Sequence, residues 1–301
     1  MELNYLTHSR KIDPSELIVD DHQRIYHLQV SRDQVAETII FVGDPQRVNV
    51  ISSFFNQIEY YTHNREFCTC TGFYNNKRLS VISTGIGTGN IDIALSELDA
   101  LFNIDFTTRK IKPNLTSLSI IRMGTCGGIH PNISIGSLLV SAYAIGLDGL
   151  MNFYDFEFTK NEKKLLDQVM TNIPALNNMI IPYVAEASKE LISPFYKTCK
   201  PVITVTADGF YGPQGRILRL RPKIKIFSEQ FVDFNFENMP IGNLEMETAG
   251  IYGLGSSLGH RCCSISIVVA DRMHGEFLTD IAKPVKDMIE TLLPIIADVA
   301  K

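Results

Sequence analysis

The stretch Val81-Ile-Ser-Thr-Gly-Ile-Gly-Thr-Gly-Asn90 joins an apolar run to an amphipathic one, and so predicts a strand, a glycine turn and the start of a helix. It does not fit the dinucleotide-binding pattern G-x-G-x-x-G, because counting from Gly85 or from Gly87 places Asn90 or Asp92 at the last glycine position. A glycine turn at a helix N-terminus still presents backbone N–H groups that suit an anion or a sugar. A strand-to-helix turn without any ligand is an equally good interpretation.

Six short apolar runs, rich in β-branched residues, recur along the chain. Most are continuous rather than alternating, which is typical of strands covered on both faces. Segments 91–101 and 285–296 carry apolar residues spaced by three and four, as amphipathic helices do. Strands that alternate with helices predict an α/β fold, with a central, mostly parallel or mixed sheet flanked by helices. The apolar runs lie at residues 38–42, 79–83, 117–121, 137–140, 202–205 and 264–269.

The 301 residues are expected to form one domain of this kind, because no linker, low-complexity tract or internal repeat divides the chain. The polar residues 1–25 are interpreted as an N-terminal extension, and residues 26–301 as the domain itself. Within it, residues 161–194 are predicted to be helical, with breaks at Asn177-Asn178 and at prolines.

Composition and charge argue against several function classes. The net charge of −5, the pI near 5.8 and the lack of a long Lys or Arg run give no footprint for nucleic acid or an anionic membrane. No apolar run reaches the roughly 18 residues of a membrane span, and the N-terminus lacks a signal-peptide pattern, so we expect a cytoplasmic protein. The six cysteines form no C-x-x-C pair and show no zinc spacing with the seven His, so we expect reduced thiols.

Ligands of open α/β sheets bind beyond the carboxyl ends of the strands, so the residues that follow each apolar run are the candidates for a site. Gly43-Asp-Pro-Gln-Arg47 follows the first run, and Arg122-Met-Gly-Thr-Cys-Gly-Gly128 follows the third. An Arg fork and unobstructed backbone N–H groups bind oxyanions. Either arginine, taken alone, is explained by a structural salt bridge. Together with the glycine loop, however, the two motifs make three such turns at strand ends, and these predict an oxyanion site.

A fourth motif, Leu244-Glu-Met-Glu-Thr-Ala-Gly250, places two acidic residues at the start of a helical stretch. A carboxylate at this point can hold a sugar diol by two hydrogen bonds. The commoner role of such a residue is to stabilise the positive end of the helix dipole.

These motifs resemble those of the nucleoside phosphorylase family. Gly43-Asp-Pro-x-Arg47, Ser83-Thr-Gly-Ile-Gly87, Arg122-x-Gly-Thr-Cys-Gly127 and Glu245-Met-Glu247 occur in the order and approximate spacing of that family. A fifth segment, Phe210-Tyr-Gly-Pro-Gln-Gly-Arg216, resembles the base pocket of its uridine phosphorylases. The resemblance runs from about Tyr26 to the C-terminal helix, and implies that residues 26–301 form a nucleoside phosphorylase-like catalytic domain.

The resemblance implies a role for each matching position. Arg65, in Asn64-Arg-Glu-Phe67, and His27 would reach the neighbouring subunit's site, the latter at the ribose 5′ hydroxyl. Phosphate would be bound by Gly43, Arg47, Arg65, Arg122 and Thr125. The ribose would be held by His27, Thr84, Met246 and Glu247. The base would be held by Phe210, Gln214, Arg216 and Arg272, and the catalytic residues would be Arg122, Gln214, Arg216 and Glu247.

The implied reaction is the phosphorolysis of uridine to uracil and ribose 1-phosphate by a pentosyltransferase of pyrimidine salvage. A Gln amide donates and accepts at once and so matches the imide of uracil, whereas a purine pocket typically offers a carboxylate to N7. Phosphate is the co-substrate, no cofactor is required, and no covalent enzyme intermediate is needed. The family resemblance also implies a homo-oligomer whose minimal active unit is a dimer, often assembled into a hexamer.

Two positions depart from the uridine phosphorylase pattern. Asp271, in Val268-Val-Ala-Asp-Arg-Met273, resembles the Asp of purine phosphorylases and nucleosidases. It is either a general acid for a purine or the salt-bridge partner of Arg272, and we favour the salt bridge. A potassium site of the bacterial enzymes is matched at Glu66 and Ile86, but Asn90 replaces its Ser; an amide oxygen also ligates a hard cation.

Three rival functions stay open. A purine nucleoside phosphorylase and a nucleosidase would use the same fold, although a hydrolase has no need of the positive charge of Arg47, Arg65 and Arg122. A non-catalytic nucleoside-binding protein is the rival from another class, and the retained phosphate-binding residues argue against it.

Overall fold

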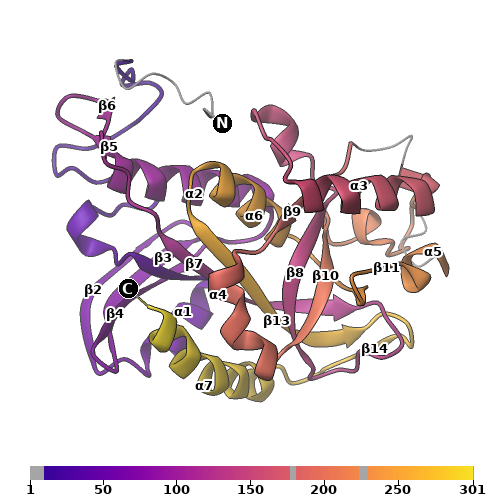
Figure 1. Ribbon diagram of the computed structural model, residues 1–301. Coiled ribbons are helices and arrows are strands. Elements are labelled where there is room, and N and C mark those ends of the chain that lie inside the picture. The colour runs from indigo at the N-terminus through magenta and orange to yellow at the C-terminus, as the bar shows by residue number, and fades with distance from the viewer. Residues whose placement is uncertain (1–9, 177–180, 224–228, 301) are drawn as a thin grey trace.

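A twelve-stranded mixed sheet runs through the middle of the computed structural model, with helices on both sides (Figure 1). The structure describes residues 10–176, 181–223 and 229–300. This architecture confirms the predicted α/β fold. The strands of the sheet are β1 (Thr38–Val42), β2 (Gln57–Asn64), β3 (Phe67–Tyr74), β4 (Lys77–Ser83), β7 (Ser119–Gly128), β8 (Leu138–Gly146), β9 (Tyr183–Glu186), β10 (Lys200–Thr206), β11 (Asn235–Phe236), β12 (Met239–Glu245), β13 (Arg261–Asp271) and β14 (Glu276–Phe277).

The helices cover the two faces of this sheet, with α2 and α6 on one side and α1 and α7 on the other (Figure 1). A separate two-stranded ribbon is formed by β5 (Ile104–Asp105) and β6 (Lys110–Ile111). The α-helices are α1 (Pro45–Ser52), α2 (Thr88–Asn103), α3 (Lys160–Asn172), α4 (Lys189–Ile192), α5 (Glu229–Asp233), α6 (Thr248–Ser257) and α7 (Ala282–Val299). The 3-10 helices are η1 (Arg32–Gln34), η2 (Leu150–Phe153), η3 (Pro174–Leu176), η4 (Ser193–Lys197) and η5 (Gly212–Gln214).

Four neighbouring strands run parallel, in the order β4, β1, β7 and β13. In this register Ile40 of β1 lies between Val81 of β4 and Ile121 of β7. Every residue of β1 is buried, as the continuous apolar run predicted. Because the strands are parallel, their carboxyl ends meet at one edge of the sheet, where the ligand of an α/β protein binds.

A ring of five strands follows from the remaining pairings. β13 pairs antiparallel with β8, and β8, β10 and β12 run parallel to one another. β12 then pairs back antiparallel with β7, with Leu244 opposite Gly127, so that β7, β13, β8, β10 and β12 form a closed circuit. This closure brings the carboxyl end of β12 to the carboxyl end of β7.

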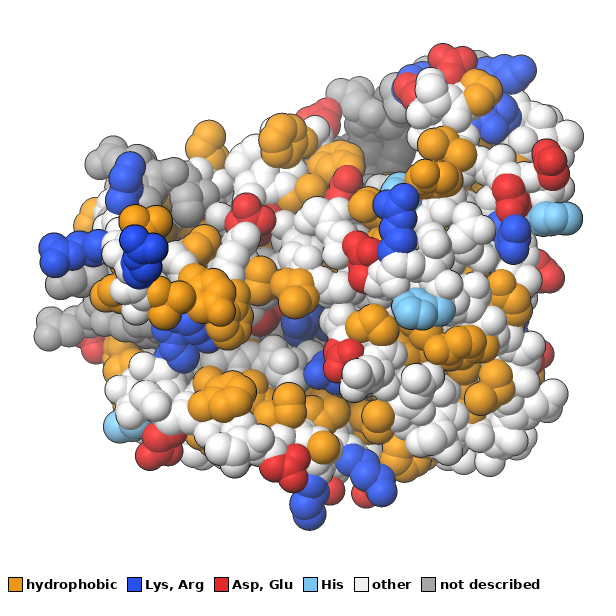
Figure 2. Space-filling view, turned by 180° about the vertical axis from the view of Figure 1, so that it is seen from behind, with side chains coloured by type: hydrophobic (Ala, Val, Ile, Leu, Met, Phe, Trp, Pro, Cys, Tyr) orange, Lys and Arg blue, Asp and Glu red, His pale blue; other side chains and the backbone are white. Residues whose placement is uncertain are grey.

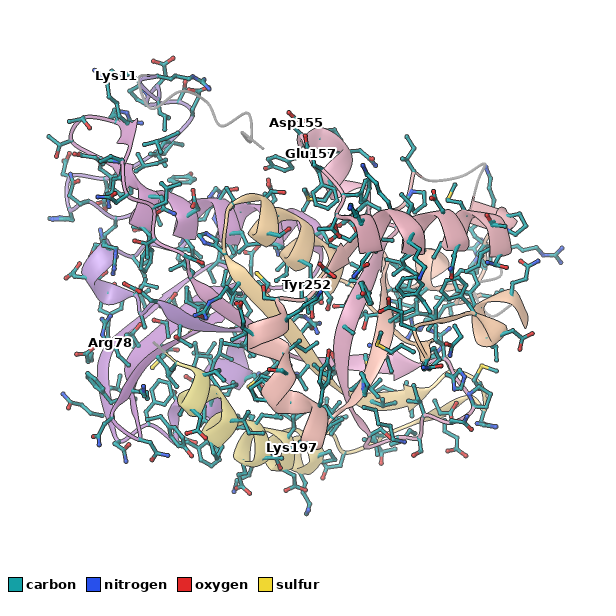
Figure 3. The ribbon with its side chains drawn as sticks, in the orientation of Figure 1. Lys11, Arg78, Asp155, Glu157, Lys197 and Tyr252 are labelled. Carbon is teal, nitrogen blue, oxygen red and sulfur yellow. The ribbon has the colours of Figure 1, made fainter. Side chains whose placement is uncertain are left out.

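Tyr252 fixes helix α6 above this ring. Its hydroxyl donates to the carbonyl oxygen of Ser141 on β8 at 2.7 Å and accepts the N–H of Ser264 on β13 at 2.7 Å. The side chain lies beneath α6, in the middle of the molecule (Figure 3). Tyr252 therefore sets the position of α6, and with it the position of the residues that precede the helix.

The structure corrects two local predictions and adds one hairpin that was not predicted. Residues 122–128 do not form a turn, because β7 continues to Gly128 while pairing with β13. Segment 161–194 is not helical throughout, since Tyr183–Glu186 forms β9 against β8; Asn177 and Asn178 lie outside the described residues. The antiparallel hairpin of β2 and β3 was not predicted, because β2 is mostly exposed and lacks an apolar run.

Charged and hydrophobic side chains are mixed on the surface (Figure 2), and the thiols are buried. On the face shown in Figure 2, basic, acidic and hydrophobic side chains lie next to one another over much of the surface. All six cysteines are buried and free. Within the described residues, no helix has the length and apolarity needed to cross a membrane.

Candidate active site

A cavity of about 690 Å³ opens at the carboxyl ends of β1, β4, β7 and β12. Most residues singled out in the sequence lie on its wall, although they come from segments far apart in the chain. Cavities of this size hold small-molecule ligands. The predicted site residues that line the cavity are Gly43, Arg47, Glu66, Ile86, Asn90, Arg122, Thr125, Phe210, Gln214, Arg216, Met246 and Glu247.

Helix α1 carries one arginine of the predicted oxyanion site. Asp44 caps the helix by accepting the N–H of Gln46 at 2.9 Å, and Pro45 occupies the first helical position. Arg47 therefore lies in the first turn, where its Nη1 donates to the carbonyl oxygen of Met123 at 3.2 Å. Burial, with the nearby charge of Arg122, lowers the pKa of Arg47. Two guanidinium groups on one cavity wall favour the binding of an anion there.

Arg122 is the central cation of the cavity and is only 5% exposed. Its side chain folds back over Gly124, where an added Cβ would lie 1.9 Å from Nη1, so the strand requires a glycine at that position. Nη1 donates to Ser266 Oγ at 3.0 Å, and Nη2 lies 2.6 Å from Glu247 Oε2 and 3.2 Å from Glu245 Oε2. Burial alone would lower the pKa of Arg122, but the two carboxylates outweigh it and raise the pKa.

The two glutamates of the Glu245-Met-Glu247 motif have different partners. Glu245 accepts the N–H groups of Glu247 and Thr248 at 3.0 Å and the Thr206 hydroxyl at 2.5 Å. It thus satisfies the N-terminus of α6. Glu247, although it is the N-cap residue, makes no side-chain capping bond and faces the cavity. The helix-stabilising acid is therefore Glu245, and Glu247 is the carboxylate available to a ligand.

The glycine loop that follows β4 holds Glu247 in place. Gly85 and Gly87 have φ angles of 70° and 94°, which glycine adopts without strain. The N–H of Gly87 donates to Glu247 Oε1 at 2.8 Å, so one N–H of this helix N-terminus binds a protein carboxylate. Burial, followed by the charge of Glu245, raises the pKa of Glu247 against the attraction of Arg122. Thr84 is buried and does not line the cavity; its hydroxyl bonds to the main chain.

A second cluster lies around η5 and contains the residues that were predicted to hold the base. Gln214 is 4% exposed, and its Oε1 accepts Arg216 Nη1 at 2.5 Å. The Arg216 guanidinium lies 3.6 Å from the centre of the Phe210 ring. Burial, together with the charge of Arg272, lowers the pKa of Arg216 to about 10. Arg272 does not line the cavity; its Nη2 donates to the Gln214 carbonyl oxygen at 3.2 Å and so supports this cluster from behind.

The prediction that Asp271 forms a salt bridge with Arg272 is wrong. Asp271 Oδ2 pairs with His274 Nδ1 at 2.8 Å, and Oδ1 accepts the N–H groups of Met273 and His274. The carboxylate closes the tight turn that leads from β13 into β14. Burial would raise the pKa of Asp271, but these hydrogen bonds outweigh it and lower the pKa. Asp271 is also absent from the cavity wall.

The three residues proposed for a monovalent cation gather around Gly85. A Cβ at Gly85 would lie 2.6 Å from Asn90 Nδ2 and 3.0 Å from Glu66 Cγ, and Asn90 Nδ2 lies 3.5 Å from the carbonyl oxygen of Ile86. A carboxylate, an amide and a carbonyl are hard oxygen donors of the kind that such a cation takes. The cation itself stays a prediction.

His27 and Arg65 lie outside the cavity of their own chain. They are close together, since the Arg65 guanidinium is 5.9 Å from the Tyr26 ring and Asn64 Nδ2 donates to the His27 carbonyl oxygen at 2.8 Å. Their assignment to a neighbouring subunit's site stays a prediction.

Several lining residues were missed in the sequence. Glu245 had a usable signal, because it lies two residues before Glu247 in a motif already singled out. Phe277 had none: it belongs to a two-residue strand, is 63% exposed, and reaches the cavity only because β14 folds back along β13. The other missed residues include Cys126, Val269 and Ala270.

Comparison with known proteins is consistent with this geometry. A model of the phosphorylase superfamily matches residues 37–297. A uridine phosphorylase of Thermococcus kodakarensis is 30% identical over 252 residues, which cover 84% of this chain and 79% of the relative. A DeoD-type purine nucleoside phosphorylase of Buchnera aphidicola is 25% identical over 273 residues, 89% of this chain and 97% of the relative.

Among solved structures, a Trypanosoma brucei nucleoside phosphorylase with uridine phosphorylase activity aligns with a TM-score of 0.83 and 28% identity. The alignment covers 94% of this chain and 98% of that protein. Because the relatives include enzymes named for uridine and for purine nucleosides, the substrate has to be argued from the site.

Proposed function

The chain belongs to the phosphorylase superfamily, and from this premise we propose that it catalyses the reversible phosphorolysis of uridine to uracil and ribose 1-phosphate. The observation that carries the proposal is the pairing of buried Gln214 with Arg216 on the cavity wall. An amide that both donates and accepts matches the imide edge of uracil. The carboxylate that a purine site would use at this end, Asp271, is turned away into a local turn.

The proposed reaction assigns a task to each part of the cavity. Arg47, Arg122 and Thr125 hold phosphate, and Glu247 accepts hydrogen bonds from the ribose hydroxyls. A phosphate oxygen bonds to C1′ of the ribose while the bond from C1′ to N1 of the base breaks, and its electron pair stays on uracil. Gln214 and Arg216 stabilise the negative charge on the departing base. Positioning and electrostatics therefore supply the catalysis.

The first prediction concerns substrate and phosphate dependence. We expect the purified protein to consume uridine only when phosphate is present, and to prefer uridine to inosine, in a spectrophotometric assay. Gln214→Ala should lower kcat/KM for uridine by about a hundredfold, because buried polar groups would lose their partner. Gln168→Ala, a half-buried residue of α3 that does not line the cavity, is the matched control and should retain full activity.

The rival functions give different results in the same assay. A preference for inosine would support a purine phosphorylase, and consumption without phosphate would support a nucleosidase. Turnover of neither nucleoside, together with uridine binding measured by calorimetry, would support a non-catalytic binding protein.

We also propose that each site is completed by His27 and Arg65 of a second subunit. Arg65→Ala and Arg122→Ala should each be inactive alone, yet a mixture refolded together should regain activity, because a mixed dimer contains one intact site. Random pairing makes about half of the dimers mixed, so about a quarter of the wild-type activity is expected. No recovery on mixing, or a fully active monomer in sedimentation analysis, would contradict shared sites.

A further inference from the structure

The carboxylate of Glu97, on helix α2, holds His27 from two directions. It accepts the His27 N–H at 2.9 Å and the Leu28 N–H at 2.9 Å, and it lies 2.6 Å from His27 Nδ1. These contacts join residues about seventy positions apart in the chain. A carboxylate that accepts at Nδ1 places the ring proton on that nitrogen and leaves Nε2 for another partner.

The surroundings of His27 fix the ring without covering it. Tyr26 and Phe67 stand edge-on to the imidazole, with ring centroids at 4.7 Å and 6.3 Å. The Glu97 side chain is 12% exposed, whereas that of His27 is 27% exposed. A hollow of about 330 Å³, lined by Tyr26, His27 and Glu97 among others, lies beside the ring. The outer edge of the imidazole is therefore held in a defined direction and can still be reached.

Helix α2 connects this histidine to the chain's own cavity. Its N-terminus follows the glycine loop that binds Glu247, and Glu97 lies nine residues further along, about 14 Å away at 1.5 Å per residue. One rigid element thus supports the ribose carboxylate at one end and the histidine at the other.

We propose that Glu97 is a positioning residue, which fixes the ring of His27 so that Nε2 meets the 5′ hydroxyl of the nucleoside in the neighbouring subunit. This inference rests on the proposed function. A hydroxyl both donates and accepts, so it can pair with Nε2 whichever of the two roles that nitrogen takes. Glu97 itself does not touch the substrate.

The test compares uridine with 5′-deoxyuridine, which lacks the hydroxyl. Glu97→Gln offers one oxygen where the carboxylate offers two, and so cannot satisfy all three donors. We expect both Glu97→Gln and His27→Ala to lower kcat/KM for uridine about tenfold, while kcat/KM for 5′-deoxyuridine changes less than twofold. The double variant should be no worse than His27→Ala alone, because Glu97 acts through His27. Glu290→Gln, on the exposed side of α7, is the control.

A merely structural role for Glu97 gives a different pattern. Equal losses on the two substrates, or additive losses in the double variant, would overturn the proposal. Glu97→Asp keeps the carboxylate and should recover part of the uridine activity; it also replaces Glu97→Gln in the comparison if that variant does not fold. An active wild type with a His27→Ala effect but no Glu97 effect overturns the positioning role only. A wild type that does not phosphorolyse uridine overturns the proposed function as well.

Discussion

Arg122→Ala is expected to lower kcat/KM for uridine by about a thousandfold or more, while the affinity for uracil falls by less than about tenfold. The guanidinium belongs to the proposed phosphate site and also pairs with Glu247, and no other described side chain donates to that carboxylate. Steady-state rates at saturating phosphate and calorimetric titration with uracil measure the two effects separately. A loss of rate and of affinity in equal proportion would argue against an enzyme that uses Arg122 on phosphate.

The stability of the Arg122 variant has to be measured beside its rate. Removing the guanidinium leaves Glu245 and Glu247 buried without their ion-pair partner, which costs about 3–5 kcal/mol in comparable sites. Ser266→Ala is the milder companion, because it removes only the acceptor of Nη1. It should lower the rate about tenfold and destabilise the fold less than Arg122→Ala does, by about 1–3 kcal/mol. Arg24→Ala, which breaks a partly exposed ion pair with Asp20, is the control for loss of an arginine.

Glu247→Gln should lower kcat/KM for uridine about a hundredfold. The amide keeps the shape of the side chain but has one acceptor oxygen for two donors, Gly87 N–H and Arg122 Nη2. It also removes the negative charge from the place proposed for the ribose. If Glu247 acts on the ribose hydroxyls, this penalty should shrink to a few-fold for 2′,3′-dideoxyuridine, which lacks them. The ratio of kcat/KM for the two substrates is the measurement.

A uniform penalty on both substrates would contradict a role at the ribose. It would mean instead that Glu247 acts through its ion pair with Arg122, by holding the guanidinium in place. Glu59→Gln, which alters a partly exposed ion pair with Arg78 on the β2 to β4 face, controls for the loss of a glutamate and should leave both rates unchanged.

The sequence by itself determined the buried strands and most of the candidate site residues that line the cavity. Continuous β-branched runs identified the buried parallel strands, since a strand covered on both faces has no polar side to alternate with. Two glycine motifs marked strand ends where backbone groups are left unpaired. They are Gly43, which precedes Arg47 by four residues, and the loop at Gly85. The motifs around Arg122, Gln214 and Glu247 predicted residues that the structure places on one wall. These signals are local, so they survive without knowledge of the fold.

Only the tertiary structure decided that Glu245 and Glu247 both meet Arg122, and where Asp271 points. Glu245 and Glu247 reach β7 because β12 closes the ring of strands, a contact between Leu244 and Gly127 that no local pattern specifies. Asp271 is turned away by hydrogen bonds within its own turn, and Phe277 enters the cavity by the return of β14. Such contacts depend on how the whole sheet packs, because the side-chain pattern of a strand fixes which faces it buries but not its neighbour.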